Sequence, residues 1–186
     1  MPNVHIDHVA MCVRDLDAAI ADWQDILDVL SPGHAGWLTR GSGTGDGTHM
    51  IWATFQNPDP TGVSIQLWAP GGDDSWVHKV LDKRGDFVHH ICFLSDDFDT
   101  TINECRKAGL PLVLDEAGSP DDTMPWLKWN FIPEAKTHGP LIELATRYTA
   151  VGDRWYPRPE NAENVHLRDD LYETYYPDDP NPKGKS

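Results

Sequence analysis

Two histidines, a glutamine and a glutamate stand at matched positions in two related halves of this 186-residue chain. The segment HVAMCVRDLDAAIAD begins at His8, and the related segment HICFLSDDFDTTINE begins at His90. A second related pair, GVSIQL and GPLIEL, brings Gln66 and Glu143 to equivalent positions near the ends of the two halves. Imidazole, carboxylate and amide groups are ligands of divalent metals. The repeat therefore predicts one metal site with two ligands from each half.

The alternation of residues around these four positions predicts that their side chains share one face of a sheet. Neighbouring residues of a strand point to opposite faces. The apolar residues that alternate with His8 are expected to pack on a helix, so His8 points away from that helix, and the same parity applies to His90, Gln66 and Glu143. Alone, a histidine in an apolar strand is more often a packed or surface residue than a ligand. The recurrence of all four positions favours the metal site.

This mixed nitrogen and oxygen ligand set predicts the kind of ion that would bind. It suits one divalent ion per chain: Zn, Co, Ni, Mn or Fe(II). One or two coordination positions would be left for water or for substrate oxygens. A cation in such a place polarises a carbonyl group and stabilises an enolate.

The segments that must position these residues are expected to follow the order β-α-β-β-β in both halves. Asp15 is a candidate cap for a helix over about 15–29, and Asp97 caps the equivalent helix of the second half. Strands are expected over 4–13, 49–56 and 63–68, with a weak strand in the glycine-rich segment between, and then over 87–94, 112–114, 126–132 and 141–147. We predict an α+β fold in which two tandem βαβββ modules, 4–70 and 86–147, form a curved mixed sheet around a metal-centred cavity.

The predicted domain spans residues 1–147, and the remainder, 148–186, belongs to neither repeat. This C-terminal extension is rich in proline, aromatic and acidic residues, with a short helix expected around 162–172. We expect the extension to pack its aromatic side chains across the domain surface. A lid over the site and an arm that clasps a second subunit stay open as alternatives.

Composition limits the partners of the chain. Its net charge of −15 argues against nucleic acid and against an anionic membrane surface, because both need basic protein surface. No apolar run is long enough to span a membrane, and the N-terminus shows no secretory signal. Cys12, Cys92 and Cys105 lack metal-type or redox spacing, so we expect reduced core cysteines. These features predict a cytoplasmic protein that acts on a small molecule.

The motifs of both halves resemble a known superfamily. HIDHVAMCVRDLDAAIADWQDIL, FVHHICFLSDDFDTTINECRKAGL and HGPLIELATRY look like the vicinal oxygen chelate superfamily, which includes glyoxalase I, methylmalonyl-CoA epimerase and extradiol dioxygenases. The resemblance covers residues 4–147 and is closest to methylmalonyl-CoA epimerases, whose ligand order His, Gln, His, Glu matches His8, Gln66, His90 and Glu143. Glyoxalase I enzymes typically have glutamate in place of Gln66. The resemblance also implies a homodimer.

The chain departs from the epimerase pattern in ways that bear on the substrate. Such epimerases carry an extra acid–base glutamate just before the third strand of the first module, where this chain reads GTGDGTHM and offers Asp46 or His49 instead. The chain also has eight tryptophans, a long extension and an acidic balance that is poorly suited to coenzyme A. The resemblance therefore implies the metal site and enolate chemistry more firmly than the substrate.

We predict a divalent-metal-dependent isomerase, epimerase or lyase that acts through a metal-stabilised enolate on a small carbonyl or carboxylate substrate. Glu143 is the first candidate for the catalytic base, provided that it loosens from the metal, His49 is the second and His138 is a weaker third. Trp68 shares the parity of Gln66, so we expect it to line the substrate cavity. Other tryptophans lie on flanking strands, and the face that each uses stays open: Trp52, Trp126 and Trp129.

Two other functions fit parts of the pattern. Two histidines and Glu143 satisfy the facial triad of an Fe(II)-dependent dioxygenase, provided that Gln66 is not a ligand. A non-catalytic resistance protein would sequester a ligand between indole rings of a dimer. Members of that class often lack the complete ligand set, which this chain has.

Overall fold

The computed structural model describes residues 2–32, 38–45, 48–57, 62–118, 127–151 and 154–157. For residues 39, 41–45, 48–49, 149–151 and 154–157 it describes the backbone alone. The short helix predicted around 162–172 lies outside the described residues. No helix among the described residues is long and apolar enough to cross a membrane.

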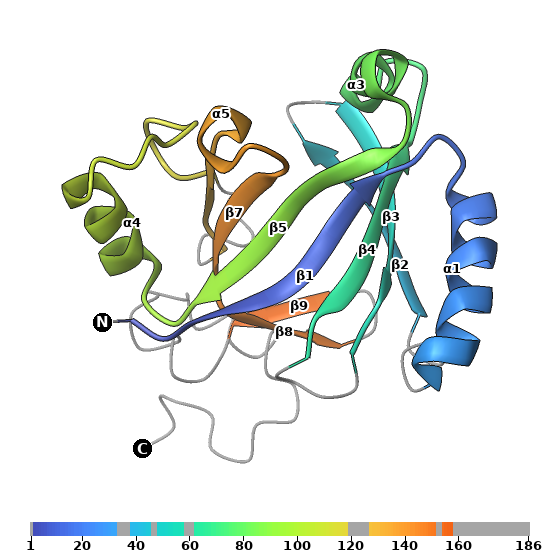
Figure 1. Ribbon diagram of the computed structural model, residues 1–186, viewed down its shortest axis with the longest axis horizontal. Helices are drawn as coiled ribbons and strands as arrows, with labels where there is room; N and C mark the ends of the chain where they lie inside the picture. Colours follow the sequence, from blue (N-terminus) through green and yellow to red (C-terminus); the bar gives the residue numbers. More distant parts are fainter. Residues whose placement is uncertain are drawn as a thin grey trace, which may run out of the picture.

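One mixed sheet forms the centre of the molecule, with strand order β2-β3-β4-β1-β5-β7-β6 (Figure 1). Its strands are β1 (Val4–Cys12), β2 (Leu38–Gly45), β3 (Thr48–Phe55), β4 (Ser64–Pro70), β5 (Phe87–Ser95), β6 (Trp129–Ile132) and β7 (Leu141–Thr146). The helices are α1 (Leu16–Leu30), α3 (Trp76–Arg84), α4 (Phe98–Lys107) and α5 (Glu134–Thr137). A separate two-stranded sheet pairs β8 (Tyr148–Val151) with β9 (Arg154–Pro157). The predicted α+β fold is confirmed.

The first half follows the predicted order β-α-β-β-β, and the second half departs from it at one strand. Residues 112–114 do not form a regular strand, although Val113 N–H donates to the Phe131 carbonyl at 2.8 Å. The buried amide of Asn130 bonds both backbone groups of Leu114 instead, at 3.1 and 2.9 Å. The Asn130 side chain thus supplies the hydrogen bonds that a neighbouring strand would otherwise supply to the backbone of Leu114.

Helix α3 was absent from our prediction because it offers only two buried apolar positions, Val77 and Leu81. Local signals nevertheless define it. The Ser75 hydroxyl caps its first turn, Lys83 and Arg84 favour the negative end of its dipole, and Gly85 ends it with a φ of 69°.

The predicted helix over 15–29 is confirmed as α1, and it packs on one face of the sheet. The Asp15 carboxylate accepts from Ala18 N–H at 3.0 Å, which satisfies a free donor of the first turn. Leu16, Ile20 and Leu27 face apolar residues of β3 and β4, including Leu67. Helix α4 covers the other half of the sheet in the same way. Figure 1 shows both helices on the outer side of the curved sheet, which leaves the inner face to the predicted ligands.

The two halves meet where β1 pairs antiparallel with β5. Val9 lies opposite Ile91, Ala10 opposite His90, and His8 opposite Cys92. The sequence repeat relates Ala10 to Cys92 and His90 to His8. It therefore converts the pair of Ala10 with His90 into the pair of Cys92 with His8. The ladder therefore obeys the twofold symmetry of the repeat. It also shifts register twice, between Ile6 and His8 and between Ala10 and Met11.

Replacing Leu67 with alanine tests the packing of α1 on the sheet. Leu67 is fully buried, so we expect the free energy of unfolding to fall by about 2–5 kcal/mol as a cavity forms. Val29→Ala is the control, because Val29 lies on α1 with 79% of its side chain exposed and should change stability by less than about 0.5 kcal/mol. Urea denaturation followed by circular dichroism measures both, and equal losses would contradict this packing.

Candidate metal centre

The register of four adjacent strands sets the predicted ligands in two rows on the inner face. One row runs from Gln66 through Ala10 to His90, and the next runs from His8 through Cys92 to Glu143. Ala10 and Cys92 occupy equivalent floor positions between the longer side chains. Both floor residues are small and fully buried, which leaves space above them for the tips of their neighbours.

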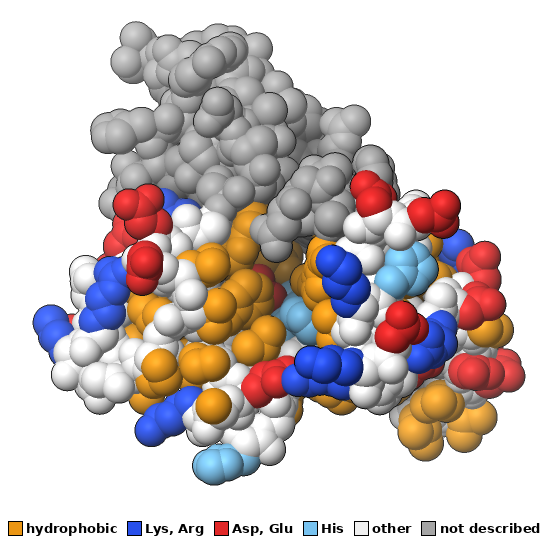
Figure 2. Space-filling view, turned by 90° about the horizontal axis from the view of Figure 1, so that it is seen from above, with side chains coloured by type: hydrophobic (Ala, Val, Ile, Leu, Met, Phe, Trp, Pro, Cys, Tyr) orange, Lys and Arg blue, Asp and Glu red, His pale blue; other side chains and the backbone are white. Residues whose placement is uncertain are grey.

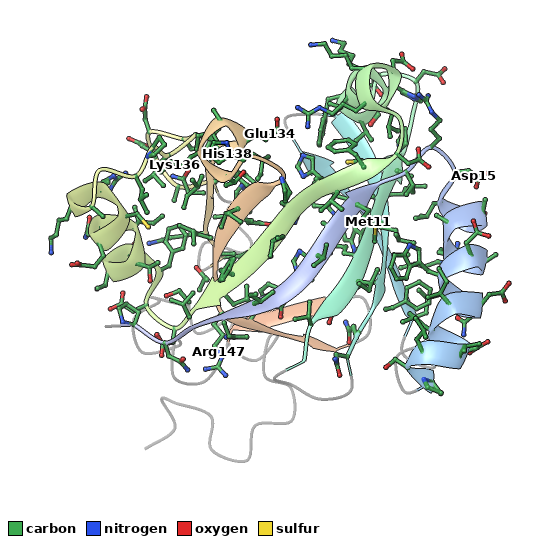
Figure 3. All side chains as sticks on the ribbon, in the orientation of Figure 1. Met11, Asp15, Glu134, Lys136, His138 and Arg147 are labelled. Carbon is green, nitrogen blue, oxygen red and sulfur yellow. The ribbon has the colours of Figure 1, made fainter. Side chains whose placement is uncertain are left out.

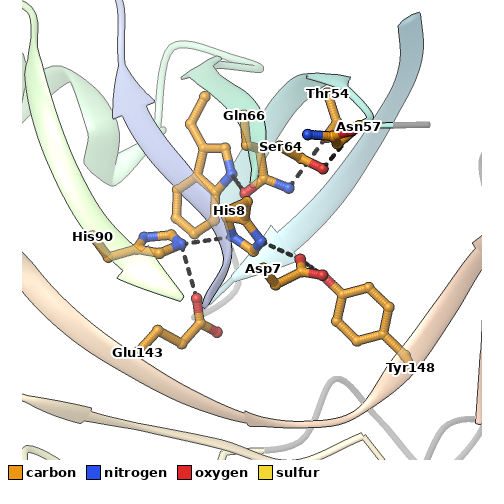
Figure 4. A network of polar contacts seen from close by, with 10 residues as sticks. Asp7, His8, Thr54, Asn57, Ser64, Gln66, His90, Glu143 and Tyr148 are labelled. Carbon is orange, nitrogen blue, oxygen red and sulfur yellow. Dashed lines mark hydrogen bonds and ion pairs between the residues drawn. The ribbon is translucent and has the colours of Figure 1, made fainter. Parts of the chain in front are cut away.

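Three of the four predicted ligands converge directly. His8 Nε2 lies 3.1 Å from His90 Nε2, and His90 Nε2 lies 2.8 Å from Glu143 Oε2 (Figure 4). Two atoms bound to one ion at about 2.1 Å and at a right angle would be separated by about 3.0 Å, so these distances fit a common centre. His90 is fully buried, and His8 is 5% exposed.

Gln66 lies beside this cluster with its amide held by two neighbours. The Gln66 oxygen accepts from the Trp68 indole N–H at 2.7 Å, while its nitrogen donates to the Thr54 hydroxyl at 3.3 Å. An amide oxygen has two lone pairs, so the indole contact leaves one for a metal ion. Figure 4 shows Gln66 extending from β4 toward the side of the sheet that carries the imidazoles.

Electrostatics favour the metal-binding forms of His90 and Glu143. Burial lowers the pKa of His90 and outweighs the opposite effect of Glu143. The lowered pKa keeps the imidazole neutral. Burial acts to raise the pKa of Glu143, but the histidines outweigh it and the net pKa is lowered. The pKa of His8 is raised, because Asp7 and Glu143 outweigh its burial. A metal ion would therefore compete with a proton at His8.

Cys92 offers an alternative third donor that our sequence interpretation assigned only to the core. One donor atom each from Cys92, His8 and Glu143 lie within 4.8 Å of one another. Burial raises the pKa of the Cys92 thiol well above its usual value, which disfavours the thiolate that metals bind. The set with His90 has direct contacts of 3.1 and 2.8 Å and needs no thiolate, so we favour it. Strand alternation could have predicted this position of Cys92, because a residue two places after His90 points to the same face of the sheet.

The other predicted site residues lie away from this cluster or outside the described side chains. His49 stands on β3 opposite Thr44, while the β3 residues opposite Gln66 and Trp68 are Thr54 and Trp52. His138 is exposed at the C-terminal end of α5 with a left-handed φ of 59° (Figure 3), so it is not placed as a base at the cluster. The side chain of His49, and all of Asp46 and Trp126, fall outside the described part.

Aromatic rings border the cluster. The Trp68 ring centroid lies 4.9 Å from that of His90 and 5.2 Å from that of His89, with Trp76 of α3 next to it at 6.5 Å. Phe131 lies 6.2 Å from His90 on the other side. Figure 2 shows hydrophobic side chains on both sides of a recess in which a histidine is visible.

The open question about two tryptophans is answered by register. Trp52 lies opposite Trp68, and Trp129 lies opposite Ala145, two residues after Glu143. Both tryptophans therefore stand on the site face of the sheet.

Comparison with known proteins shows the family. A model of the glyoxalase/bleomycin resistance protein/dioxygenase superfamily matches residues 7–124, more than half of the chain. The chain belongs to this superfamily. The resemblance seen in the sequence motifs is thereby confirmed. No protein of curated function matches the sequence.

Solved structures of epimerases resemble this one. Methylmalonyl-CoA epimerase from Mycobacterium tuberculosis is 28% identical, with a TM-score of 0.60 over 86% of this chain and 91% of that one. A variant of the Streptomyces coelicolor methylmalonyl-CoA epimerase with 2-nitronate-propionyl-CoA is 26% identical, with a TM-score of 0.56 over 76% and 96%. A methylmalonyl-CoA epimerase with methylmalonyl-CoA and NH4+ is 27% identical, with a TM-score of 0.57 over 81% and 99%.

A substitution at Cys92 distinguishes the two donor sets, and a substitution at Glu143 tests the carboxylate that both sets share. We expect Glu143→Gln to weaken Zn(II) binding by about 100-fold or more, because it removes the charged ligand from a buried site. Cys92→Ala should leave the affinity within about threefold, since the thiol is not a ligand in the favoured set. Competition with a chromophoric chelator measures both. A large loss of Zn(II) affinity in Cys92→Ala would instead show that the Cys92 sulfur binds the ion.

The metal-free protein should lose stability in acid through His89. Burial and the neighbouring His90 lower the pKa of His89 from 6.5 to about 4. Between these values the unfolded chain binds the proton better, so stability falls as the pH drops from 6.5 toward 4, by about 2 kcal/mol at pH 5. Urea midpoints of His89→Gln should fall less between pH 7 and pH 5 than those of the wild type. Equal losses would contradict the lowered pKa.

Proposed function

We propose that this protein is a divalent-metal-dependent isomerase or epimerase, with a lyase as a variant of the same chemistry, acting on a small carbonyl or carboxylate substrate. The observation that carries the proposal is the convergence of His8 Nε2, His90 Nε2 and Glu143 Oε2 at 3.1 and 2.8 Å. The similarity to methylmalonyl-CoA epimerases supports an epimerase-type reaction.

We propose His8, Gln66, His90 and Glu143 as the residues that hold the ion. When bound, a divalent ion there supplies a Lewis acid that polarises a substrate carbonyl and stabilises an enolate. The protein keeps the two Nε2 atoms available by engaging each Nδ1 elsewhere, His8 with Asp7 at 2.7 Å and His90 with His89 at 2.8 Å. The buried surroundings exclude water and strengthen electrostatic interactions with a substrate.

Proton transfer at the substrate carbon requires a base, and we propose Glu143 in this role when its carboxylate loosens from the ion. Its side chain is partly open, with 15% of it exposed, and it contacts His90 directly. Its lowered pKa keeps it ionised, so it accepts a proton instead of donating one at neutral pH. His49 stays the second candidate.

The acidic balance of the chain, with a net charge of −15, favours a substrate smaller than a coenzyme A ester. Several exposed basic side chains are already paired with carboxylates and offer little to a phosphate group: Arg14, Arg40, Arg84, Lys107 and Lys128. We propose that Trp68 lines the substrate position, since its ring lies against His90. The aromatic border would suit a flat or apolar substituent next to the carbonyl group.

Hydrogen exchange in D2O tests the proposed chemistry. Protein loaded with Zn(II) or Co(II) should exchange the proton next to the carbonyl of methylmalonyl-CoA, pyruvate or phenylpyruvate faster than the protein-free blank, as proton NMR measures. At saturating metal, Glu143→Gln should lose about 100-fold or more of this rate. His49→Gln should keep it if Glu143 is the base.

The exposed His138 supplies the control, and asparagine tolerates its left-handed backbone conformation. His138→Asn should exchange at the wild-type rate. Loss of exchange in His49→Gln with full metal content would transfer the role of base to His49. Absence of exchange with every compound would count against the proposed chemistry and favour a protein that binds its ligand without turnover.

One contact favours a second candidate function, an Fe(II)-dependent dioxygenase. The Gln66 oxygen accepts a 2.7 Å bond from Trp68, and if this bond keeps Gln66 off the ion, His8, His90 and Glu143 form a two-histidine, one-carboxylate set. Such a set is typical of non-haem Fe(II) oxygenases. Oxygen uptake by anaerobically iron-loaded protein in the presence of a catechol would favour this candidate over the epimerase.

We also propose that the protein is a cytoplasmic homodimer. Cys12, Cys92 and Cys105 are free, which suits a reducing compartment. The dimer is implied by the family resemblance, and light scattering after size-exclusion chromatography measures it.

A further inference from the structure

The two register shifts of the β1–β5 ladder fall at equivalent positions of the sequence repeat. Ile6 pairs with Phe93 and His8 with Cys92, so Asp7 is an extra residue in β1. Ala10 pairs with His90 and Met11 with Val88, so His89 is the extra residue in β5. Asp7 directly precedes His8, and His89 directly precedes His90. The repeat therefore places one bulged residue immediately before each proposed histidine ligand.

A bulge turns a side chain away from the strict alternation of a strand. Strict alternation would send Asp7 and His89 to the face opposite their histidines. Instead, the Asp7 carboxylate lies 2.7 Å from His8 Nδ1, and His89 Nδ1 lies 2.8 Å from His90 Nδ1. Each bulged residue therefore contacts the Nδ1 atom of the histidine that follows it.

These contacts determine which ring nitrogen is available at the cluster. An ionised carboxylate can only accept a hydrogen bond, so Asp7 fixes the His8 proton on Nδ1 and leaves the Nε2 lone pair free. When His89 Nδ1 accepts from His90 Nδ1–H, it does the same for His90. The two Nε2 atoms, 3.1 Å apart, then both have a lone pair available to bind one shared ion.

A residue beyond the second module fixes Asp7. The Tyr148 hydroxyl donates to Asp7 Oδ2 at 3.1 Å, and that oxygen also accepts from His8 (Figure 4). Tyr148 begins β8, at the start of the C-terminal extension, and it packs against a buried cluster that contains Cys92 and Ala145. The extension therefore reaches the proposed metal centre through the contact of Tyr148 with Asp7.

We propose that Asp7 and His89 are positioning residues that the paired bulges hold against the two histidine ligands, and that Tyr148 of the extension orients Asp7. This inference rests on the proposed metal site. It assigns a role at that site to three residues, none of which is itself a proposed ligand.

Metal titration of the metal-free protein tests the inference without any substrate. Affinities for Zn(II) come from competition with a chromophoric chelator, and Co(II) at saturation gives a visible spectrum of the ligand geometry. We expect Asp7→Ala and His89→Ala to weaken Zn(II) binding by about 10- to 100-fold and to shift the Co(II) bands. Tyr148→Phe should weaken binding by about 2- to 10-fold, because it removes one hydrogen bond to Asp7. His89→Gln should recover affinity, since its amide oxygen can accept from His90.

Ser95→Ala is the matched control, because it removes a buried hydroxyl contact with Thr101 at 2.6 Å on β5 without touching the histidines. It should keep the wild-type affinity and spectrum. A variant that only lost folded protein would show weaker Co(II) bands at unchanged positions. Wild-type affinities and spectra in both Asp7→Ala and His89→Ala would overturn the inference while leaving the metal site standing. A wild-type protein that binds no ion would overturn the metal site and this inference together, and equal losses in Ser95→Ala would overturn the inference alone.

Discussion

The antiparallel pairing of β1 with β5 is the constraint on which the site depends. This ladder joins the two modules, and its register sets His90 beside Ala10 and Cys92 beside His8. The parallel ladders on either side then add Gln66 to the first row and Glu143 to the second. A slip of one residue in the central ladder would turn His8 or His90 to the helix-covered face. The close approach of the two Nε2 atoms is thus a consequence of strand pairing.

Burial makes this cluster costly unless every polar group has a partner. His8, Gln66 and His90 are almost fully buried, and an unpaired buried polar group is unfavourable by about 1–3 kcal/mol. The surrounding side chains supply those partners: Asp7, Glu143, His89, Trp68 and Thr54. The same network directs the free donor atoms inward. Polar groups held in this way are ready to bind an ion with little rearrangement.

Family membership and site surroundings contribute different kinds of information. The superfamily match and the similar epimerase structures are consistent with the fold. The aromatic border of Trp68, Trp76 and Phe131, and the pairing of basic side chains with acids, belong to this chain's own chemistry. One fold supports many reactions, so these local features bear most on the choice of substrate.

The sequence alone determined the repeat, the α+β fold and the common face of His8, Gln66, His90 and Glu143. It could do so because alternation and internal duplication are both visible in a linear pattern. It did not reveal helix α3, whose apolar positions are few, or the irregular path of residues 112–114, where the Asn130 side chain replaces a ladder.

Only the tertiary structure decided what surrounds the four residues. Asp7 and His89 were hidden because bulges break the alternation that the prediction used. Tyr148 reaches Asp7 from the far end of the domain, and no local pattern records such a contact. Strand parity states which face a side chain takes, but pairing register and bulges decide which atoms meet there.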